Sequence, residues 1–467
     1  MAVGPTPVAT GDDGTVSQPS ERQWPSTASA YWGLTVIVLA TGMTFFDQVI
    51  FGMLGERVKH DFGLTDSQLG FLAGPAGIII YIFVGIPIAR LADIYPRRLV
   101  LASSAVVVGS IISLGGFAQN FYQFIASRVF LSAGGSAHAP SSYSILADSF
   151  PPKKLTRAFA LLQFGFIGGT TLGPLLGGYL VMTMGGWEPT HVGPLMIRGW
   201  QWILIFAGLP SILIGLLFLT VKEPPRLIPA TDTVQPPSDA RLSRRVLTFM
   251  GLDAFKAIFS RPKVYLPLFG ALALSAVDTF GLQFWRTPFM IRTYGWNEGE
   301  IGAAIGAITL TASLSGLVIG GVLVEWLAKK HKDANVRAAT ICFSMVTICA
   351  IAGPLMPNGW AALITFGVGA MFGLAGAVPQ NAAIQRIAPN AMRGQVTAIY
   401  LFMFTFFGAI GSYVVGLVQD LVVGDEQQLW KALVITAVAL LPLATFFMFK
   451  AIRPYREEVE RLEALGG

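Results

Sequence analysis

The chain has few charged residues and almost no cysteine. Asp, Glu, Lys and Arg make up 12% of its 467 residues, whereas hydrophobic residues make up 53%. This composition excludes an ordinary soluble protein and predicts a polytopic membrane protein. The two cysteines, Cys342 and Cys349, lie two turns apart in one apolar run, so neither a disulfide scaffold nor a metal site is predicted.

The sequence also lacks the hallmarks of other protein classes. It has no GxxxxGK[ST] phosphate loop and no sizeable soluble region, which argues against an ATP-driven pump. Its intramembrane ionisable residues are scattered rather than clustered as an acid, base or metal set, which argues against an enzyme. The net charge of +6 comes mainly from short connections, so no nucleic-acid partner is expected. No cofactor is predicted either.

Twelve apolar runs are each long enough to cross a bilayer as a helix. They lie at 31–55, 68–92, 99–119, 121–147, 157–184, 200–221, 264–290, 300–327, 337–356, 359–384, 394–419 and 429–450. Basic residues concentrate in alternate connections, which by the positive-inside rule places both termini in the cytoplasm. The predicted fold is an all-α membrane protein with twelve transmembrane helices.

The longest interruption divides these spans into two sets of six. The residues before the first span are rich in Gly, Pro, Ser and Thr and lack the basic start of a signal peptide, which predicts a disordered tail. The predicted order is a cytoplasmic tail at 1–29, an N-terminal six-helix bundle at 30–221, a cytoplasmic linker at 222–263, a C-terminal six-helix bundle at 264–450 and a cytoplasmic tail at 451–467. A weak internal repeat supports two related halves, between which cargo would bind.

A basic, proline-containing turn, GIPIARLADIYPRR, joins the second and third spans at Gly85–Arg98. Its Ala-x-Leu-Ala-Asp segment followed by a basic pair resembles the signature loop of the major facilitator superfamily. The resemblance implies two pseudo-symmetric six-helix bundles, secondary transport by alternating access, and a conformational latch at Asp93, Arg97 and Arg98. Ile94 departs from the pattern, which usually has Arg directly after the Asp. We expect the protein to be a monomer.

Further motifs resemble the Spinster-like branch of that superfamily. They are FGLTDSQLG at 62–70, GWQW at 199–202, EPPR at 223–226 and MRG at 392–394. The branch comprises secondary transporters, and sphingolipids and lysolipids are among the proposed cargo of its animal members. Two positions differ from the branch, because Gln48 replaces an Arg after the span-one Asp, and Gly135 replaces a span-four Glu implicated in proton coupling.

Five ionisable residues within spans are functional candidates, because charged groups are costly in a membrane. They are Asp47, Arg128, His138, Asp278 and Arg286. Asp47 and Arg128 lie at similar depth and can pair, either for proton coupling or as a permanent structural pair. His138 is either a substitute proton carrier or a hydrogen-bonding residue within the bundle. Asp278 is a further proton-coupling candidate.

A polar stripe on span seven predicts the cargo site. Thr279, Gln283 and Arg286 recur at i, i+4 and i+7 and therefore share one helix face. Arg286 can bind a carboxylate or phosphate and Trp285 can stack on cargo, although both also fit an interfacial position near the end of the span. Arg128 is another candidate for cargo contact. Gln380 and Asn381 are candidates as well, with packing or backbone capping as the alternative role.

Span five contains the glycine-rich segment GTTLGPLLGG at 169–178. Small residues allow close helix packing, and the proline permits a bend. The segment resembles the antiporter motif of the superfamily, in which the bend is thought to help seal the pathway against protons, although close packing alone also explains it. The residues of this motif are Gly169, Gly173, Pro174, Gly177 and Gly178.

Together these features predict a proton-coupled secondary transporter, with antiport favoured, in a bacterial inner membrane. Its partners would be protons, the bilayer and an organic-anion, amphipathic or lysolipid-like cargo. Its bundles would rock about a central site, with the Asp93 latch biasing one state and Asp47 coupling protons to cargo. The departures at Gln48 and Gly135 leave two alternatives, a sodium-coupled or uniport carrier of an organic acid and a transport-deficient receptor on the same fold.

Overall fold

The computed structural model describes residues 24–225, 258–388 and 393–464, apart from positions 79, 81–83, 85–90 and 92–93. Within these residues, ten helices are long and apolar enough to cross a membrane. They confirm the predicted all-α membrane protein. The single sheet in the described residues is a hairpin of two antiparallel strands in which Thr190 is paired with Ile197.

The first set of helices forms the N-terminal bundle. Its main pairings are α1 with α7 and α4 with α8, which run along each other for much of their length. The elements are α1 (Thr27–Phe62), α2 (Asp66–Ala73), α4 (Arg97–Gly115), α5 (Phe121–Gly135), α6 (His138–Ser149), α7 (Pro152–Met184), β1 (Thr190–Val192), β2 (Leu195–Ile197) and α8 (Gly199–Phe218).

The second set forms the C-terminal bundle, in which α11 packs against α15 and α16, and α14 packs against α12 and α13. Its last helix continues without a break beyond the predicted span, so residues 451–464 are helical. The elements are α11 (Pro262–Tyr294), α12 (Glu298–Ala328), α13 (Ala334–Ala352), η2 (Gly353–Leu355), α14 (Gly359–Ile387), α15 (Arg393–Val418), η4 (Gln419–Val423), η5 (Glu426–Gln428) and α16 (Leu429–Ala464).

Two of the twelve predicted spans are not among the ten long helices. The second span, 68–92, falls largely outside the described residues, and α2 covers only its beginning. The fourth span, 121–147, is divided into α5 and α6 by a turn at Ser136–Ala137. The physical reason is local, because Gly134 and Gly135 precede this turn and glycine is a poor helix former.

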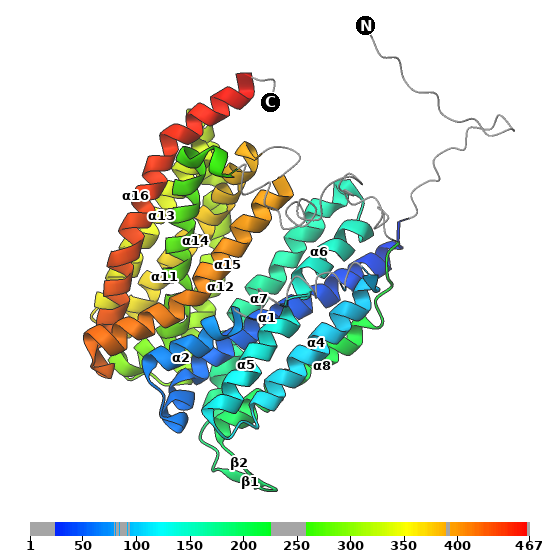
Figure 1. Cartoon of the computed structure of the whole chain (residues 1–467), viewed down its shortest axis with the longest axis vertical. Coiled ribbons are helices and arrows are strands. Elements are labelled where there is room, and N and C mark those ends of the chain that lie inside the picture. The colour runs from blue at the N-terminus through cyan, green and yellow to red at the C-terminus, as the bar shows by residue number, and fades with distance from the viewer. Residues whose placement is uncertain are drawn as a thin grey trace, which may run out of the picture.

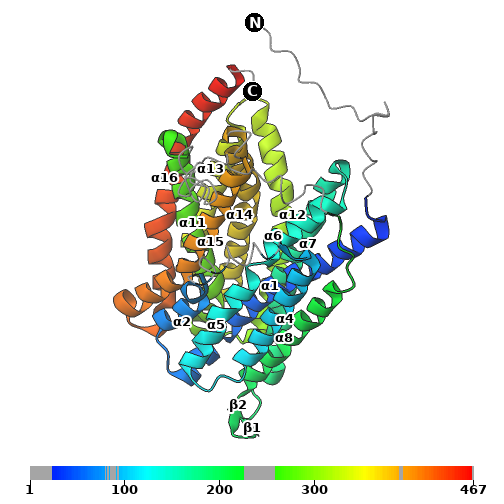
Figure 2. The same cartoon turned by 45° about the vertical axis from the view of Figure 1, so that its right-hand side comes forward.

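The two bundles converge at the end of the molecule that carries the β1–β2 hairpin and diverge toward the end where α1 begins and α16 ends (Figures 1 and 2). We call these the hairpin end and the termini end. Helices from the two bundles pack directly on each other in the pairs α7 with α12, α2 with α15 and α1 with α11. Near the hairpin end, a Cβ added at Gly302 of α12 would lie 2.2 Å from the carbonyl oxygen of Pro174 in α7, so glycine is required there.

The hydrophobic core follows the same division. One cluster of buried side chains at the hairpin end includes residues of both bundles, such as Phe51 and Trp200 from one and Phe284 and Phe289 from the other. The remaining large clusters each belong to a single bundle, at 258–459 and at 30–221. The bundles therefore share a core at one end only.

Candidate functional site: a charged cavity between the bundles

A cavity of about 840 Å³ lies between the two bundles. Helices of both bundles line it, including α1 and α5 on one side and α11, α14 and α15 on the other. Of the residues predicted from the sequence, the cavity wall contains Asp47, Arg128, His138, Pro174, Asp278, Thr279, Gln283, Arg286, Gln380 and Asn381. The predicted polar stripe of span seven thus faces one shared space.

The predicted pair of Asp47 and Arg128 is formed. The Oδ2 atom of Asp47 lies 3.5 Å from Nη1 of Arg128, and both side chains are buried. The guanidinium also stacks over Phe51, with Cζ 4.1 Å from the ring centroid, a favourable cation–π position. The second carboxylate oxygen of Asp47 is buried without a hydrogen-bond partner in the described structure. This oxygen is available to a proton or to another donor.

Asp278 and Arg286, both on α11, have no ion-pair partner among the described residues. Asp278 is 6% exposed, and no described residue forms an ion pair or hydrogen bond with it. Arg286 likewise has no ion-pair partner in the described residues, and its Nε atom is buried without a hydrogen-bond acceptor. The residues are eight positions apart, which corresponds to about 12 Å along a helix. Unpaired charges in a buried cavity are costly unless a ligand or a proton compensates them.

His138 lies at the start of α6, next to the turn that divides the fourth span. Its Nε2 atom is 3.0 Å from the Thr41 hydroxyl of α1, so it forms a hydrogen bond between two helices while lining the cavity. Gly135 also lines the cavity, and a Cβ at this position would meet no atom within 4 Å. A side chain at this position would therefore begin in open space at the cavity wall.

The other cargo candidates differ in their placement. Gln380 is 3% exposed, and its Nε2 is a buried donor without a described acceptor, whereas the Asn381 oxygen accepts a hydrogen bond from Gln385 at 3.2 Å. Trp285 does not line the cavity. Its indole is fully buried and donates a hydrogen bond of 2.7 Å to the Ser412 carbonyl of α15. Both the predicted cargo contact and the interfacial alternative fail for Trp285, because the face next to the polar stripe packs against α15.

The glycine-rich segment of α7 packs tightly against α1. A Cβ at Gly169 would lie 2.4 Å from the carbonyl oxygen of Gly42, and one at Gly173 would lie 3.2 Å from the Val49 side chain. A Cβ at Gly177 would lie 3.0 Å from the side chain of Met53, which is also on α1. A Cβ at Gly178 would instead lie 2.7 Å from the carbonyl oxygen of Glu298 in α12. The segment therefore joins α7 to a helix of each bundle.

The predicted latch is described in part, because Asp93 lies outside the described residues. Arg97, at the start of α4, is buried and forms ion pairs with Asp148 of α6 and with Glu223, whose Oε1 is 2.9 Å from Nε. Glu223 also accepts a hydrogen bond of 2.9 Å from the backbone N–H of Arg98. These contacts join α4 to α6 and to the residues that follow α8, and none of them reaches the C-terminal bundle.

A second charged cluster, at the hairpin end, was not predicted. Asp66, the first residue of α2, accepts two hydrogen bonds of 2.8 Å from Arg292 of α11 and one of 2.7 Å from Lys59. Arg292 also contacts Glu56 at 2.7 Å. Burial alone would raise the pKa of Asp66, but the hydrogen bonds and charges of Arg292 and Lys59 hold it below its ordinary value.

This hairpin-end cluster includes further contacts between the bundles. Arg57 pairs with Glu298 at 2.9 Å, and Lys59 pairs with Glu426 at 2.7 Å. The carboxylate of Asp420 accepts a hydrogen bond of 2.8 Å from the backbone N–H of Ser67, which neutralises the start of α2. In the sequence, the basic members of this cluster indicate only topology, because their acidic partners are up to about 370 residues away.

A multi-pass all-α protein with two bundles around a charged cavity has the architecture of a membrane transporter. The model of the family described as Major Facilitator Superfamily matches residues 36–412. The chain belongs to this superfamily and is a secondary transporter by class rather than an enzyme.

Similar proteins agree with this assignment. An MFS-type efflux pump of Mycolicibacterium smegmatis is 24% identical over 94% of this chain and 96% of its own length. The sphingosine-1-phosphate transporter SPNS2 of Danio rerio is 25% identical over 78% of this chain and 71% of its own length. A bacterial homologue of the lysosomal transporter Spinster, solved in an inward-facing and unoccupied conformation, has a TM-score of 0.74 at 20% identity over 93% of this chain and 98% of its own. The resemblance to the Spinster-like branch is confirmed.

Proposed function

We propose that this protein exports an anionic amphipathic molecule across a bacterial inner membrane in exchange for protons. The observation that carries the proposal is the unpaired guanidinium of Arg286 in the wall of the central cavity. A buried Arg without an acidic partner is stabilised by a ligand carboxylate or phosphate, which it can bind through two parallel hydrogen bonds. Gln283, one turn away on the same face, supplies a further polar contact.

The cavity wall is otherwise largely apolar, which suits the hydrocarbon part of such a cargo. Phe51, Phe284 and Phe404 contribute aromatic surface, while Leu131 and Leu272 contribute aliphatic surface. The relative from Danio rerio carries sphingosine-1-phosphate in its name, a molecule with an anionic head and a long apolar chain. This likeness supports the proposed cargo class.

In this proposal, protons are exchanged at carboxylates of the cavity. Asp47 pairs with Arg128 in this state but keeps one oxygen free, and Asp278 has no described cationic partner. A carboxylate in such a setting alternates between charged and neutral forms as water access changes. His138 remains a third candidate, although its hydrogen bond to Thr41 equally fits a structural role.

We further propose that the hairpin end is extracellular and that both termini are cytoplasmic. Exposed basic residues at the termini end, such as Lys153, Lys154, Lys329 and Lys330, support this orientation by the positive-inside rule. With this orientation the bundles are closed on the outside, so the structure represents an inward-facing state. Export is supported by the similarity to an efflux pump over nearly the whole chain.

The decisive experiment measures proton movement into proteoliposomes while lysolipids, fatty acids and aromatic carboxylates are added one at a time. We expect one cargo class to evoke proton flux in the parent, and Asp47→Asn to lose it. Arg286→Gln should weaken binding of that cargo roughly ten- to hundredfold, because a hydrogen-bonded charge contributes about 1.5–3 kcal/mol. Lys431→Gln, which removes a cation that lies over Trp430 outside the cavity, is the matched control.

Other outcomes lead to the alternatives. Cargo movement without proton movement favours a sodium-coupled or uniport carrier, and no movement of either favours a receptor. Gly135→Glu sharpens the test, because Gly135 lines the cavity and a Cβ there would meet no atom within 4 Å. If this variant gains proton coupling that the parent lacks, Asp47 is not the coupling residue.

A further inference from the structure

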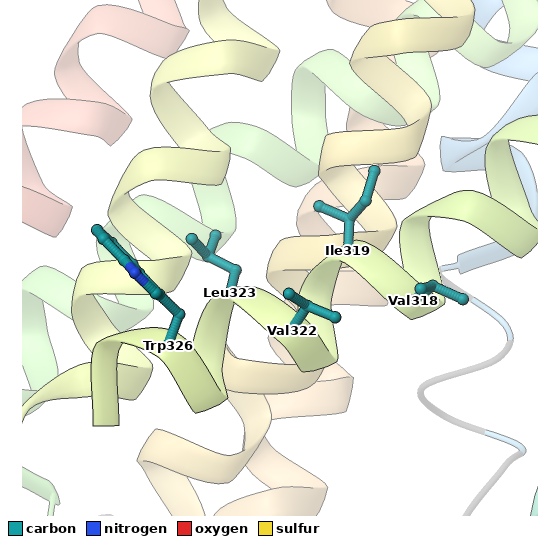
Figure 3. Close-up of a pocket in the computed structure, with 5 residues that line it drawn as sticks. All are labelled: Val318, Ile319, Val322, Leu323 and Trp326. Atoms are coloured by element: carbon teal, nitrogen blue, oxygen red, sulfur yellow. The ribbon is translucent and has the colours of Figure 1, made fainter. Parts of the chain in front are cut away.

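A groove on the surface of α12 lies outside the central cavity. Its volume is about 370 Å³, and its lining consists of Val318, Ile319, Val322, Leu323 and Trp326 (Figure 3). Val318, Val322 and Trp326 are spaced four residues apart and therefore form one stripe of the helix. All three are at least 60% exposed, so the stripe faces the membrane rather than another helix.

Two lysines continue this stripe toward the termini end. Lys329 and Lys330 directly follow Ala328, the last residue of α12, and are three and four residues beyond Trp326. They therefore lie about one turn beyond Trp326, at the termini end of this helix. Both are exposed, and no described residue forms an ion pair with either. Lys332, by contrast, pairs with Glu463 at 2.7 Å. Glu325 is also exposed on the preceding turn, so the two lysines leave a local excess of one positive charge.

We propose that the α12 groove and its two lysines bind one anionic phospholipid from the leaflet at the termini end. An acyl chain fits the apolar stripe, and the phosphate lies at Lys329 and Lys330. Trp326 stands between these parts, at the depth where aromatic side chains meet lipid headgroups. The charge complementarity identifies the occupant, because a zwitterionic headgroup carries its own cationic group beside the phosphate and leaves the excess positive charge of the lysines uncompensated.

The proposed site is separate from the cargo cavity and does not depend on the proposed cargo. The cavity is lined by other residues of α12, among them Ile305, Thr309 and Ser313, which lie nearer the hairpin end. The opposite face of α12 packs against α14, where a Cβ at Gly320 would lie 2.6 Å from the Ala375 carbonyl. A lipid on the exposed stripe therefore contacts α12 from outside the bundle.

The test uses quenching of tryptophan fluorescence by brominated phospholipids in vesicles that contain the full-length protein. The signal of Trp326 is obtained as the difference between the parent and Trp326→Phe. We expect brominated phosphatidylglycerol to quench this signal at a lower mole fraction than brominated phosphatidylcholine. The difference should be about fivefold for each lysine that contacts the headgroup. Lys329→Gln with Lys330→Gln should remove the difference, and Arg at both positions should preserve it.

Two controls separate this site from general surface charge. Lys153→Gln with Lys154→Gln removes two exposed cations at the start of α7 and should leave the preference unchanged. Val322→Phe fills the groove while keeping the lysines and should reduce the preference. Equal quenching by the two lipids, an equal loss in the α7 variant, or full preference after Val322→Phe would each overturn the proposal. Competition by soluble glycerol phosphate would likewise overturn it, by indicating a site for free phosphate.

Discussion

The two ends of the molecule use their ion pairs in opposite ways. At the hairpin end, Arg292 and Arg57 pair with acidic residues of the other bundle. At the termini end, every ion pair in the described residues joins groups of the same bundle, as for Arg97 with Glu223 and Arg456 with Asp333. The hydrophobic clusters divide in the same manner, with a shared core at one end and separate cores at the other.

This difference explains how one chain can be closed at one end and divided at the other. Contacts between the bundles at the hairpin end hold them together, whereas contacts within each bundle at the termini end keep each bundle rigid when the two separate. Such an arrangement suits rigid-body rocking about a central site, because charge pairs at the hairpin end can be broken without unfolding either bundle.

The largest effect is expected from Asp66→Asn. Asp66 is 1% exposed and accepts three hydrogen bonds from Arg292 and Lys59, so its replacement leaves two buried cations undercompensated. Breaking a buried pair costs about 3 kcal/mol, which would favour opening of the hairpin end roughly a hundredfold. Spin labels at Met196→Cys and Leu421→Cys, in a background without Cys342 and Cys349, would report the distance between the bundles.

Asp61→Asn is the matched control for this variant. Asp61 lies at the same end and contacts Trp200 and Arg198, but all three residues belong to the N-terminal bundle. An unchanged distance distribution in Asp66→Asn, or the same change in both variants, would show that Asp66 does not hold the bundles together. Acidification tests the same contacts, because the pKa of Asp66 is held below its ordinary value of 3.8. The stabilisation by Asp66 is therefore present above pH 3.8 and is lost as the pH falls from there through the lowered pKa.

A smaller effect of a different kind is expected from Asp333→Asn. Asp333 is fully buried at the start of α13 and pairs with Arg337 and Arg456 of the same bundle, each at 2.8 Å. Its loss should lower the apparent midpoint of thermal unfolding by a few degrees, because it frees the helical extension of α16 from the bundle. The distance between the spin labels at the hairpin end should not change. A change in that distance would mean that the termini-end pairs also control closure.

Local periodicity explains which parts of the site could be predicted from the sequence. Thr279, Gln283 and Arg286 share a face because of helix geometry alone, and Asp47 and Arg128 pair because their depths in the membrane are similar. Features that depend on a neighbouring helix were not accessible. Trp285 is adjacent to the stripe in sequence but packs on α15, and Arg292, the partner of Asp66 in the other bundle, is 226 residues away from it.

The breaks in the predicted spans have the same origin. Hydropathy averages over about 20 residues, so the apolar run at 121–147 indicates one helix. The turn at Ser136–Ala137 depends instead on two preceding glycines and on the position of His138 against Thr41 of α1. Sequence pattern thus predicts which segments enter the membrane, whereas interruptions within them depend on side-chain contacts between helices.

The smallest effect tests whether pairing across the bundles, rather than charge at each position, holds the hairpin end closed. Arg57 and Glu298 are 32% and 17% exposed in their side chains, so solvent limits their interaction to about 0.5–1 kcal/mol. Arg57→Glu and Glu298→Arg should each shift the spin-label distances slightly toward opening. The double exchange should recover most of the closed population, but not all of it, because Arg57 also donates a hydrogen bond of 2.8 Å to the Gly185 carbonyl. Additive effects of the two changes would show that this pair contributes nothing across the bundles, and would leave the contact of Asp66 with Arg292 as the main ionic contact between them.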